Sequence, residues 1–239
     1  ATREFLIDEG FVEIQTPRFI GSATEGGAAL FSLDYFGQKA YLAQSPQLYK
    51  EQLTSVFEKV FEIGPFFRAE ESRTRRHISE FTSLDIECAF TDQKGVTEIL
   101  ERLIHHIYKS VLDRSRNELN TLNVTLEAPA LPFPRLTYDE VIDRLSKEGV
   151  EVKWGEDIPT AAEKKLGELY KGFYFVVDWP ATSKPFYIAP RADDPRYSDS
   201  FDLMCGSLEL ASGGTRVHEH DVLLARLKEQ GLDPEGFKD

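Results

Sequence analysis

The segment from Phe66 to Glu87 gathers basic, acidic and aromatic residues in a pattern that could bind a phosphate-bearing ligand. An apolar run stops at Arg68, a charge-rich loop with Arg73 and His77 follows, and the chain returns through Glu80–Glu87 with acids on alternate positions. Such alternation is typical of a strand, so the pattern predicts two antiparallel strands around a polyanion, joined by a cationic loop. We interpret this layout as a nucleotide site, and a solvated charged turn is the alternative.

The strand after the loop divides into two faces, because successive side chains of a strand point in opposite directions. One face carries Phe81, Ser83, Asp85 and Glu87. The other, within Thr82–Cys88, is largely apolar and is expected to pack against helices. The first face is therefore the candidate site, although core packing is an alternative for Phe81, and Glu87 is interpreted as structural.

Two more carboxylates, Asp202 and Glu209, flank a possible turn at residues 205–207. Hard oxygen ligands of this kind suit a magnesium ion that keeps some of its waters and bridges nucleotide phosphates. Scattered acids on a chain of formal net charge −13 are usually solvated, so the spacing alone is a weak indication. Ser212–Gly214 follows and offers a hydroxyl and a close backbone approach.

Composition limits the class of protein. A chain of 239 residues with 41% hydrophobic residues can bury one sizeable core. Cys88 and Cys205 show no metal-ligand spacing, which fits a reducing compartment. No apolar run approaches the roughly 20 residues of a membrane helix, and no signal-peptide pattern is seen, so we expect a soluble, cytoplasmic protein. The acidic charge opposes general binding to nucleic-acid backbones, and any such contact should be local.

The elements that position these residues follow from the periodicity of the chain. Expected helices are 1–10, 97–112 and 138–147, and expected strands are 11–17 at an edge, 40–43, 172–178 in the centre, 185–188, and a hairpin over 200–210. Ser45 is expected to cap a helix that has Pro46 in its first turn. Strands and helices mix without a βαβ repeat, which favours an α+β fold with a mixed, mainly antiparallel sheet flanked by helices. Residues 131–171 suggest an insertion within one domain that spans 1–239.

Six segments, in family order, resemble the catalytic domain of class II aminoacyl-tRNA synthetases, specifically the aspartyl-tRNA synthetases of archaeal and eukaryotic cytosolic type. They are Gly10–Pro17, Ala23–Gly27, Gln44–Lys50, Phe67–Phe81, Lys184–Tyr187 and Glu209–Arg216. The resemblance implies an enzyme that activates L-aspartate with ATP and Mg²⁺ to aspartyl-adenylate and passes it to tRNA(Asp). It also implies a homodimer formed through the Gly10–Pro17 region, and it leaves open whether tRNA(Asn) is charged as well.

The resemblance further implies roles for individual residues. Arg68 and His77 would be catalytic, because they would hold the α- and γ-phosphates of ATP. The ATP site would comprise Arg68, Glu70, His77, Phe81, which stacks on adenine, and Glu209. The aspartate pocket would comprise Glu25, Ser45, Gln47, Lys50, Asp85 and Arg216. Asp202, Glu209 and Ser212 would hold the metal ion.

Charge explains how such a pocket would choose its amino acid. Lys50 and Arg216 together would pair with the side-chain carboxylate of aspartate, and arginine can do so through two hydrogen bonds. Asparagine would leave buried cations unpaired, which is costly. The alternative interpretations are a solvated surface lysine and, for Arg216, a structural ion pair with an acid.

Several alternatives stay open. The family closes its ATP site with a third, glycine-rich motif that includes Glu-Arg, and the sequence reaches Asp239 without one. We therefore expect either a piece of a longer synthetase or a paralogue that lacks this motif. An asparagine-tRNA ligase or a synthetase-derived asparagine synthetase is the enzymatic alternative. A catalytically inactive module that dimerises and binds RNA or a protein partner is the non-enzymatic one.

Overall fold

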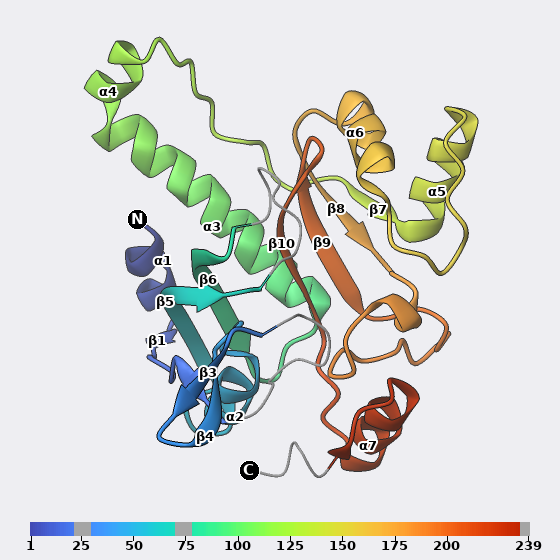
Figure 1. Ribbon diagram of the computed structural model, residues 1–239. Coiled ribbons are helices and arrows are strands. Elements are labelled where there is room, and N and C mark those ends of the chain that lie inside the picture. The colour runs from blue at the N-terminus through green and yellow to red at the C-terminus, as the bar shows by residue number, and fades with distance from the viewer. Residues whose placement is uncertain (22–29, 70–77, 235–239) are drawn as a thin grey trace. The chain divides into compact units, whose positions relative to one another are not determined.

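The computed structural model describes residues 1–21, 30–69 and 78–234 (Figure 1). The chain divides into two compact units, which we describe separately. The N-terminal unit comprises Arg3–Phe90 and Leu227–Asp239, and the central unit comprises Thr91–Arg226 with Ala1–Thr2. Within the described ranges, no helix is long and apolar enough to cross a membrane.

The N-terminal unit is organised around two long antiparallel strands, β5 (Lys59–Phe67) and β6 (Glu80–Cys88). They pair along their whole length, from Lys59 opposite Cys88 to Phe67 opposite Glu80. Strand β1 (Val12–Glu13) pairs in parallel with β5 at the edge of this sheet. The predicted pair of strands on either side of the basic loop is therefore confirmed, and the predicted edge strand is present but short.

The remaining elements of this unit support the pair. A second sheet has the order β2-β4-β3 in the described residues, and helices α1 and α2 complete the unit. Their bounds are Phe19–Ile20 (β2), Ser32–Tyr35 (β3), Gln38–Leu42 (β4), Thr2–Asp8 (α1) and Gln47–Phe57 (α2). The helix expected at residues 1–10 and the strand expected at 40–43 are confirmed, and Leu6 of α1 is fully buried.

A buried ion pair ties the segment after β1 to β5. Glu62 of β5 is buried and accepts hydrogen bonds from the Thr16 amide, at 3.0 Å, and from the Arg18 guanidinium. The guanidinium also lies 4.3 Å from the centre of the Phe66 ring. A Cβ on Gly64 would lie 2.1 Å from Arg18 Nη2, so a side chain at this position of β5 would displace the guanidinium from its contact with Glu62.

The central unit contains a sheet with the order β10-β9-β8-β7 among the described residues. Its strands are β7 (Arg135–Thr137), β8 (Phe173–Val177), β9 (Ser200–Cys205) and β10 (Leu208–Gly214). Strand β9 is antiparallel to both neighbours, whereas β7 is parallel to β8. The predicted central strand at 172–178 and the hairpin at 200–210 are confirmed, and so is the mixed, mainly antiparallel fold class.

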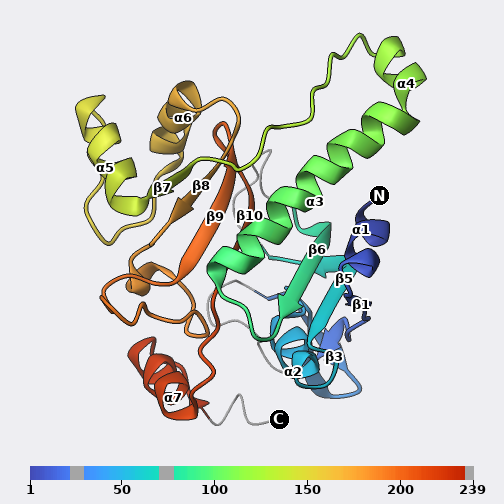
Figure 2. The ribbon, with the colours of Figure 1, turned by 180° about the vertical axis from the view of Figure 1, so that it is seen from behind.

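Helices cover the two faces of this sheet. One face is covered by α5 (Tyr138–Lys147) and α6 (Thr160–Leu169), and the other by α3 (Gln93–Arg114). The chain also forms α4 (Arg116–Thr121), a 3₁₀ turn η1 at Ala181–Ser183, and α7 (His220–Glu229), which crosses the boundary between the two units. One face buries Tyr174, Val176 and Met204 together with residues of α5 and α6. The other buries Phe175 and Leu203 with residues of α3, on the side that Figure 2 shows.

Helix α5 has the bounds that the sequence predicts, and its first turn carries a strong local signal. The Thr137 hydroxyl accepts a hydrogen bond from the Glu140 amide at 3.2 Å, and Glu140 Oε2 accepts one from the Thr137 amide at 2.9 Å. This reciprocal capping box satisfies amide groups that the first turn of a helix leaves without partners. Strand β7 places part of the predicted insertion, residues 131–171, in the sheet; the insertion itself stays a prediction.

Three local predictions are wrong. Residues 185–188 form a loop rather than a strand, in which Ile188 makes an isolated bridge with Arg216. Helix α2 begins at Gln47, so Pro46 is its cap residue, and the Ser45 hydroxyl accepts from the Gln47 amide at 3.2 Å from one position earlier. Leu84 is 39% exposed, so the apolar face of β6 is less covered than expected; local alternation identifies two faces but does not say which is buried.

Candidate active site

Helix α2 and strand β6 bring a buried lysine against two carboxylates. Lys50 is 6% exposed, and its Nζ lies 3.1 Å from Asp85 Oδ1 and 3.5 Å from Glu87 Oε2. Asp85 and Glu87 share a face of β6, as their alternate spacing predicts. The Ser83 hydroxyl, on the same face, donates to Asp85 Oδ2 at 2.6 Å. A buried lysine between two acids can bind a zwitterion by exchanging these internal partners for those of a ligand.

The electrostatics of Asp85 follow from these contacts. Burial alone would raise the pKa of its carboxyl group. The charge of Lys50, the hydrogen bonds from Ser83 and Lys50, and the more distant charge of Arg68 outweigh burial, so the pKa of Asp85 lies below its ordinary value. The carboxylate is therefore ionised at neutral pH and can accept a hydrogen bond from an ammonium group.

Glu87 contacts the same lysine, a pairing that the sequence alone does not show. It is 8% exposed and shares Lys50 with Asp85. Its place beside Asp85 was available in the sequence, because it lies two positions after Asp85 on the same face of a strand. The sequence interprets Glu87 as structural, and its contact with Lys50, 37 positions earlier in the chain, is compatible with that interpretation.

Two other predicted residues of the amino-acid pocket lie at the start of α2. Ser45 is 8% exposed and Gln47 is 4% exposed, both about one turn before Lys50. The Gln47 side-chain amide donates to Glu51 within the helix. Glu25, predicted for the same pocket, lies outside the described residues.

Arg68 and Phe81 are the residues of the predicted ATP site that the structure describes in the N-terminal unit; Glu209, also predicted for that site, belongs to the central unit. Arg68 follows β5, and its amide donates to the Ser79 carbonyl at 3.0 Å. Its guanidinium carbon lies 5.3 Å from the centre of the Phe81 ring, an arrangement that places a cation beside an aromatic face. Phe81 also packs against a small core that includes Phe66, so one part of the ring serves packing. Glu70 and His77 lie outside the described residues.

A β-bulge places the predicted metal ligands of the central unit on one face. In the hairpin, Ser212 is opposite Asp202 and Glu209 is opposite Met204, with a register shift between Glu209 and Ala211. Residues three apart on a regular strand point to opposite faces, so Glu209 and Ser212 share a face only because of this irregularity. Directly opposed residues of antiparallel strands also share a face. Asp202, Glu209 and Ser212 therefore lie together.

Asp202 has a protein partner that the sequence interpretation did not assign. Lys184 Nζ lies 2.9 Å from both carboxylate oxygens of Asp202, which is 5% exposed. The same ammonium group lies 4.1 Å from the centre of the Trp179 ring. Lys184 belongs to one of the six segments that carry the family resemblance, which was the signal that could have found it.

Glu209 lies in a strongly acidic environment. It lines a cavity of about 50 Å³ whose lining residues are Asp157, Ile158, Glu163, Leu166, Val176, Trp179, Asp202, Met204 and Glu209. Surrounding protein and the negative charge of Asp202 raise the pKa of Glu209 above its ordinary value. The side chain stays accessible to solvent, which screens part of the Asp202 charge. A cation beside Glu209 would relieve this repulsion.

The donor set fits a magnesium ion that shares its coordination with phosphates. In the described part of the chain, no three His, Cys, Asp or Glu side chains are grouped so that they could hold a metal ion. A closed, all-protein metal cage is thus not formed by those residues. Two carboxylates and a hydroxyl on one face match the way proteins bind Mg²⁺, through one or two carboxylates with water and phosphate oxygens completing the shell.

Arg216 follows β10 in the central unit, whereas Lys50 belongs to the N-terminal unit. Its guanidinium carbon lies 5.3 Å from the centre of the Tyr187 ring. The bridge between Ile188 and Arg216 fixes the backbone on this side. Arg216 is thus held beside the same loop, residues 184–188, that supplies Lys184 to Asp202.

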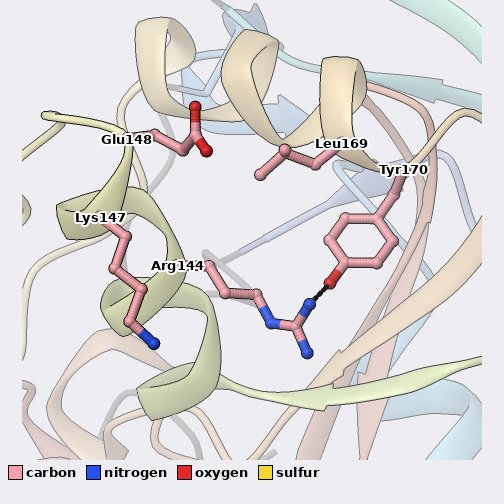
Figure 3. Close-up of a pocket in the computed structure, with 5 residues that line it drawn as sticks. All are labelled: Arg144, Lys147, Glu148, Leu169 and Tyr170. Carbon is pink, nitrogen blue, oxygen red and sulfur yellow. Dashed lines mark hydrogen bonds between the residues drawn. The ribbon is translucent and has the colours of Figure 1, made fainter.

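A larger hollow of about 330 Å³ lies between α5 and α6 (Figure 3). It is lined by Arg144, Lys147, Glu148, Leu169 and Tyr170. The side chains of Arg144 and Tyr170 point toward each other, and Arg144 donates a hydrogen bond to the Tyr170 hydroxyl. None of the predicted site residues that the structure describes lines this hollow, so we take the clusters around Lys50 and around Asp202, each within its own unit, as the candidate sites.

Comparison with known proteins finds relatives that match almost the whole chain. The chain is 52% identical over 238 residues to the aspartate–tRNA(Asp/Asn) ligase of Archaeoglobus fulgidus, a match that covers 99% of the chain and 55% of that protein. It is 48% identical over 245 residues to the aspartate–tRNA(Asp) ligase of Pyrococcus abyssi, covering 100% of the chain and 56% of that protein. The chain thus spans little more than half the length of these relatives.

A solved structure gives the same result for the fold. The asparaginyl-tRNA synthetase of Pyrococcus horikoshii, in complex with asparaginyl-adenylate, superimposes with a TM-score of 0.93 at 38% sequence identity, and the match covers 99% of the chain and 56% of that protein. The family described as tRNA synthetases class II (D, K and N) matches residues 1–239. The chain therefore belongs to the class II tRNA synthetases of the D, K and N type.

Proposed function

We propose that this chain provides the catalytic part of an aspartate–tRNA ligase, which forms aspartyl-adenylate from L-aspartate and ATP and transfers the aspartyl group to tRNA(Asp). The observation that carries the proposal is the buried Lys50 between Asp85 and Glu87. The aspartate–tRNA ligases that match over almost the whole chain support it. Because the chain spans about half of those proteins, the activity is proposed for the complete protein.

The Lys50 cluster favours aspartate as the amino acid. Lys50 pairs with the side-chain carboxylate of the substrate, while Asp85 accepts from the substrate α-ammonium group. Glu87 stays beside Lys50 in this exchange and keeps the lysine in place. Asparagine presents a neutral amide, so Lys50 would exchange its charged partner Asp85 for an uncharged one, which is unfavourable for a buried ammonium group. Arg216 is the second cation proposed for the substrate carboxylate, with Ser45, Gln47 and Glu25 completing the pocket.

Arg68 and Phe81 would serve ATP, together with Glu70 and His77. An oxygen of the aspartate α-carboxylate attacks the α-phosphorus of ATP. The bond between the α-phosphorus and the oxygen that bridges to the β-phosphorus breaks, and pyrophosphate leaves with that electron pair. No side chain acts as a nucleophile, so the contribution of the protein is orientation and charge stabilisation. Arg68 stabilises negative charge on the α-phosphate, and the Phe81 ring stacks on adenine, an interaction that contributes about 1–3 kcal/mol for bases on aromatic rings in other proteins.

The Asp202 cluster would hold Mg²⁺ through Glu209 and Ser212, with Asp202 beside them. When bound, the ion would neutralise charge on the nucleotide phosphates. The mixed surroundings of Glu209, partly open to solvent and flanked by other acids, support a site that is completed by ligands from the substrate.

Dimer formation, the tRNA partner and a cytoplasmic location are further parts of the proposal. Strand β1 lies at a sheet edge, and Ile7 and Val12 near it are 57% and 41% exposed, which supports an apolar contact with a second copy. Some relatives are named as ligases for tRNA(Asp) and tRNA(Asn), and others for tRNA(Asp) alone. The proposal therefore leaves open whether tRNA(Asn) is also a substrate.

The test is pyrophosphate exchange by the complete protein expressed from the parent gene. We expect exchange that depends on L-aspartate and is not supported by asparagine at equal concentration. Exchange supported by asparagine instead would replace the proposal by an asparagine–tRNA ligase, which the structural match to asparaginyl-tRNA synthetase makes the second candidate. Exchange with neither amino acid, in a folded complete protein, would favour the inactive module.

A further inference from the structure

Lys184 is held against Asp202 more firmly than an ordinary surface lysine. Its Nζ donates to both carboxylate oxygens at 2.9 Å, and the exposed fractions of the two side chains are 15% and 7%. The ammonium group also lies 4.1 Å from the centre of the Trp179 ring, where the electron-rich aromatic face attracts a cation. The two hydrogen bonds and the aromatic contact together hold this partly buried ammonium group in place.

The backbone before Lys184 is also fixed. The Ser183 amide and hydroxyl both donate to the Pro180 carbonyl, at 3.0 and 2.8 Å, and close the η1 turn. Arg226 Nη2 donates to the Ala181 carbonyl at 2.8 Å, and this arginine is 7% exposed. The lysine side chain thus starts from an anchored turn, so its position over Asp202 is built into the fold.

This geometry has a consequence for metal binding. Asp202 shares a face with Glu209 and Ser212, yet both of its oxygens accept hydrogen bonds from Lys184. A divalent ion that binds Asp202 directly must share these oxygens with the ammonium group, and it is repelled by the positive charge of that group. The remaining protein ligands, Glu209 and Ser212, are too few to hold magnesium tightly without phosphate oxygens.

We propose that Lys184 is a positioning residue that occupies Asp202 and thereby keeps the affinity of the site for a free divalent ion low until nucleotide phosphates are present. The inference rests on the magnesium assignment made under the proposed function. Lys184 makes metal binding depend on ATP, because the phosphates supply the oxygen ligands that Asp202 does not offer. A purely structural lysine would affect folding stability without changing metal affinity.

The experiment measures Mn²⁺ binding to the complete protein without nucleotide, by electron paramagnetic resonance of the free ion. We expect Lys184→Met to bind Mn²⁺ at least about tenfold more tightly than the wild type, since a positive charge is removed and Asp202 becomes available. Lys184→Arg, which keeps the charge, should stay close to the wild type. Lys165→Met is the matched control, because Lys165 pairs with two carboxylates, Glu148 and Glu168, at 3.0 and 3.2 Å.

A double-mutant cycle separates competition from other effects. In an Asp202→Asn background, Lys184→Met should change Mn²⁺ affinity much less than it does alone, because the carboxylate that it releases is absent. Lys184→Gln replaces Lys184→Met if thermal unfolding shows that the methionine variant is not folded. Unchanged Mn²⁺ affinity in a folded variant, or equal tightening in Lys165→Met, overturns the proposal. Aspartate-dependent exchange is measured separately, so failure of the proposed function is distinguished from failure of this inference.

Discussion

Replacing Lys50 by methionine should destabilise the protein strongly at neutral pH. Methionine has a similar volume, so the change removes the charge without leaving a large cavity. It leaves Asp85 and Glu87, with exposed side-chain fractions of 17% and 9%, without their cation. Removing one member of a buried ion pair costs about 3–5 kcal/mol elsewhere, a large part of the roughly 5–15 kcal/mol that stabilises a typical domain.

The loss of stability should depend on pH with a definite sign. In the wild type the pKa of Asp85 lies below its ordinary value, so this carboxylate stabilises the fold above pH 4 or so, and that stabilisation is lost as pH falls through the folded-state pKa. In Lys50→Met, Asp85 is buried without the lysine, and protonation relieves it. The difference in unfolding free energy between the two proteins should therefore shrink as pH falls from about 7 to about 3.

The assay is urea unfolding of the complete protein at several pH values, followed by fluorescence. Lys39→Met is the matched control, because Lys39 is exposed and contacts the Tyr41 ring, with Nζ 5.4 Å from the ring centre. It should change stability by less than about 1 kcal/mol at any of these pH values. A difference for Lys50→Met that stays constant from pH 7 to pH 3 would refute the assignment of Lys50 as the counter-charge of these acids. Glu87→Gln in the Lys50→Met background should recover part of the stability.

The other predictions concern the phosphates, the metal and the fold. Arg68→Ala should abolish pyrophosphate exchange while the unfolding transition stays within about 1 kcal/mol of the wild type, and near-normal exchange would remove Arg68 from the α-phosphate. Glu209→Gln should raise the magnesium concentration needed for exchange about tenfold in a magnesium titration. Because the pKa of Glu209 is raised, protons compete with the ion for this carboxylate. The magnesium requirement of the wild type should therefore grow as pH falls, and that of the variant should not. Thr137→Ala should cost about 1 kcal/mol in urea unfolding through loss of the α5 cap, and no loss would show that Glu140 alone suffices.

The sequence was sufficient where the signal is local. Helix α5 was predicted with its observed bounds because Thr137 and Glu140 form a capping box within four residues. The β9–β10 hairpin and the β5–β6 pair were predicted from alternation and turn residues. The apolar run at residues 185–188 predicts a strand, but the structure has a loop there. Its residues are apolar because they pack in the interior, as Phe186 does at 2% exposure, and not because they alternate along a strand. Burial and secondary structure are separate properties, and a short apolar run does not distinguish them.

The sequence predicts which residues belong to the candidate site, but not which of them contact one another. Lys50 and Asp85 were both assigned to the amino-acid pocket, but their contact at 3.1 Å depends on how α2 packs on β6. Glu209 and Ser212 were both assigned to the metal, yet a spacing of three on a strand would separate them without the bulge that only the pairing with β9 reveals. The roles of these residues stay predictions until the proposed experiments are done.

Both clusters use the same arrangement, a buried lysine shared with or held by carboxylates on a neighbouring strand, in a chain of formal net charge −13. From the net charge alone, such acids would be expected in solvent and such lysines on the surface. Inside the protein these groups must pair, because an unpaired ion away from water costs free energy, and each charge then fixes the position of its partner. On the proposed function the site binds anionic phosphates and carboxylates, and lysines that are already paired can hold their position before those ligands arrive. On the proposed function, Asp85 therefore acts as a stand-in for the substrate carboxylate at Lys50, whereas Lys184 sets how strongly a divalent ion must compete for the oxygens of Asp202.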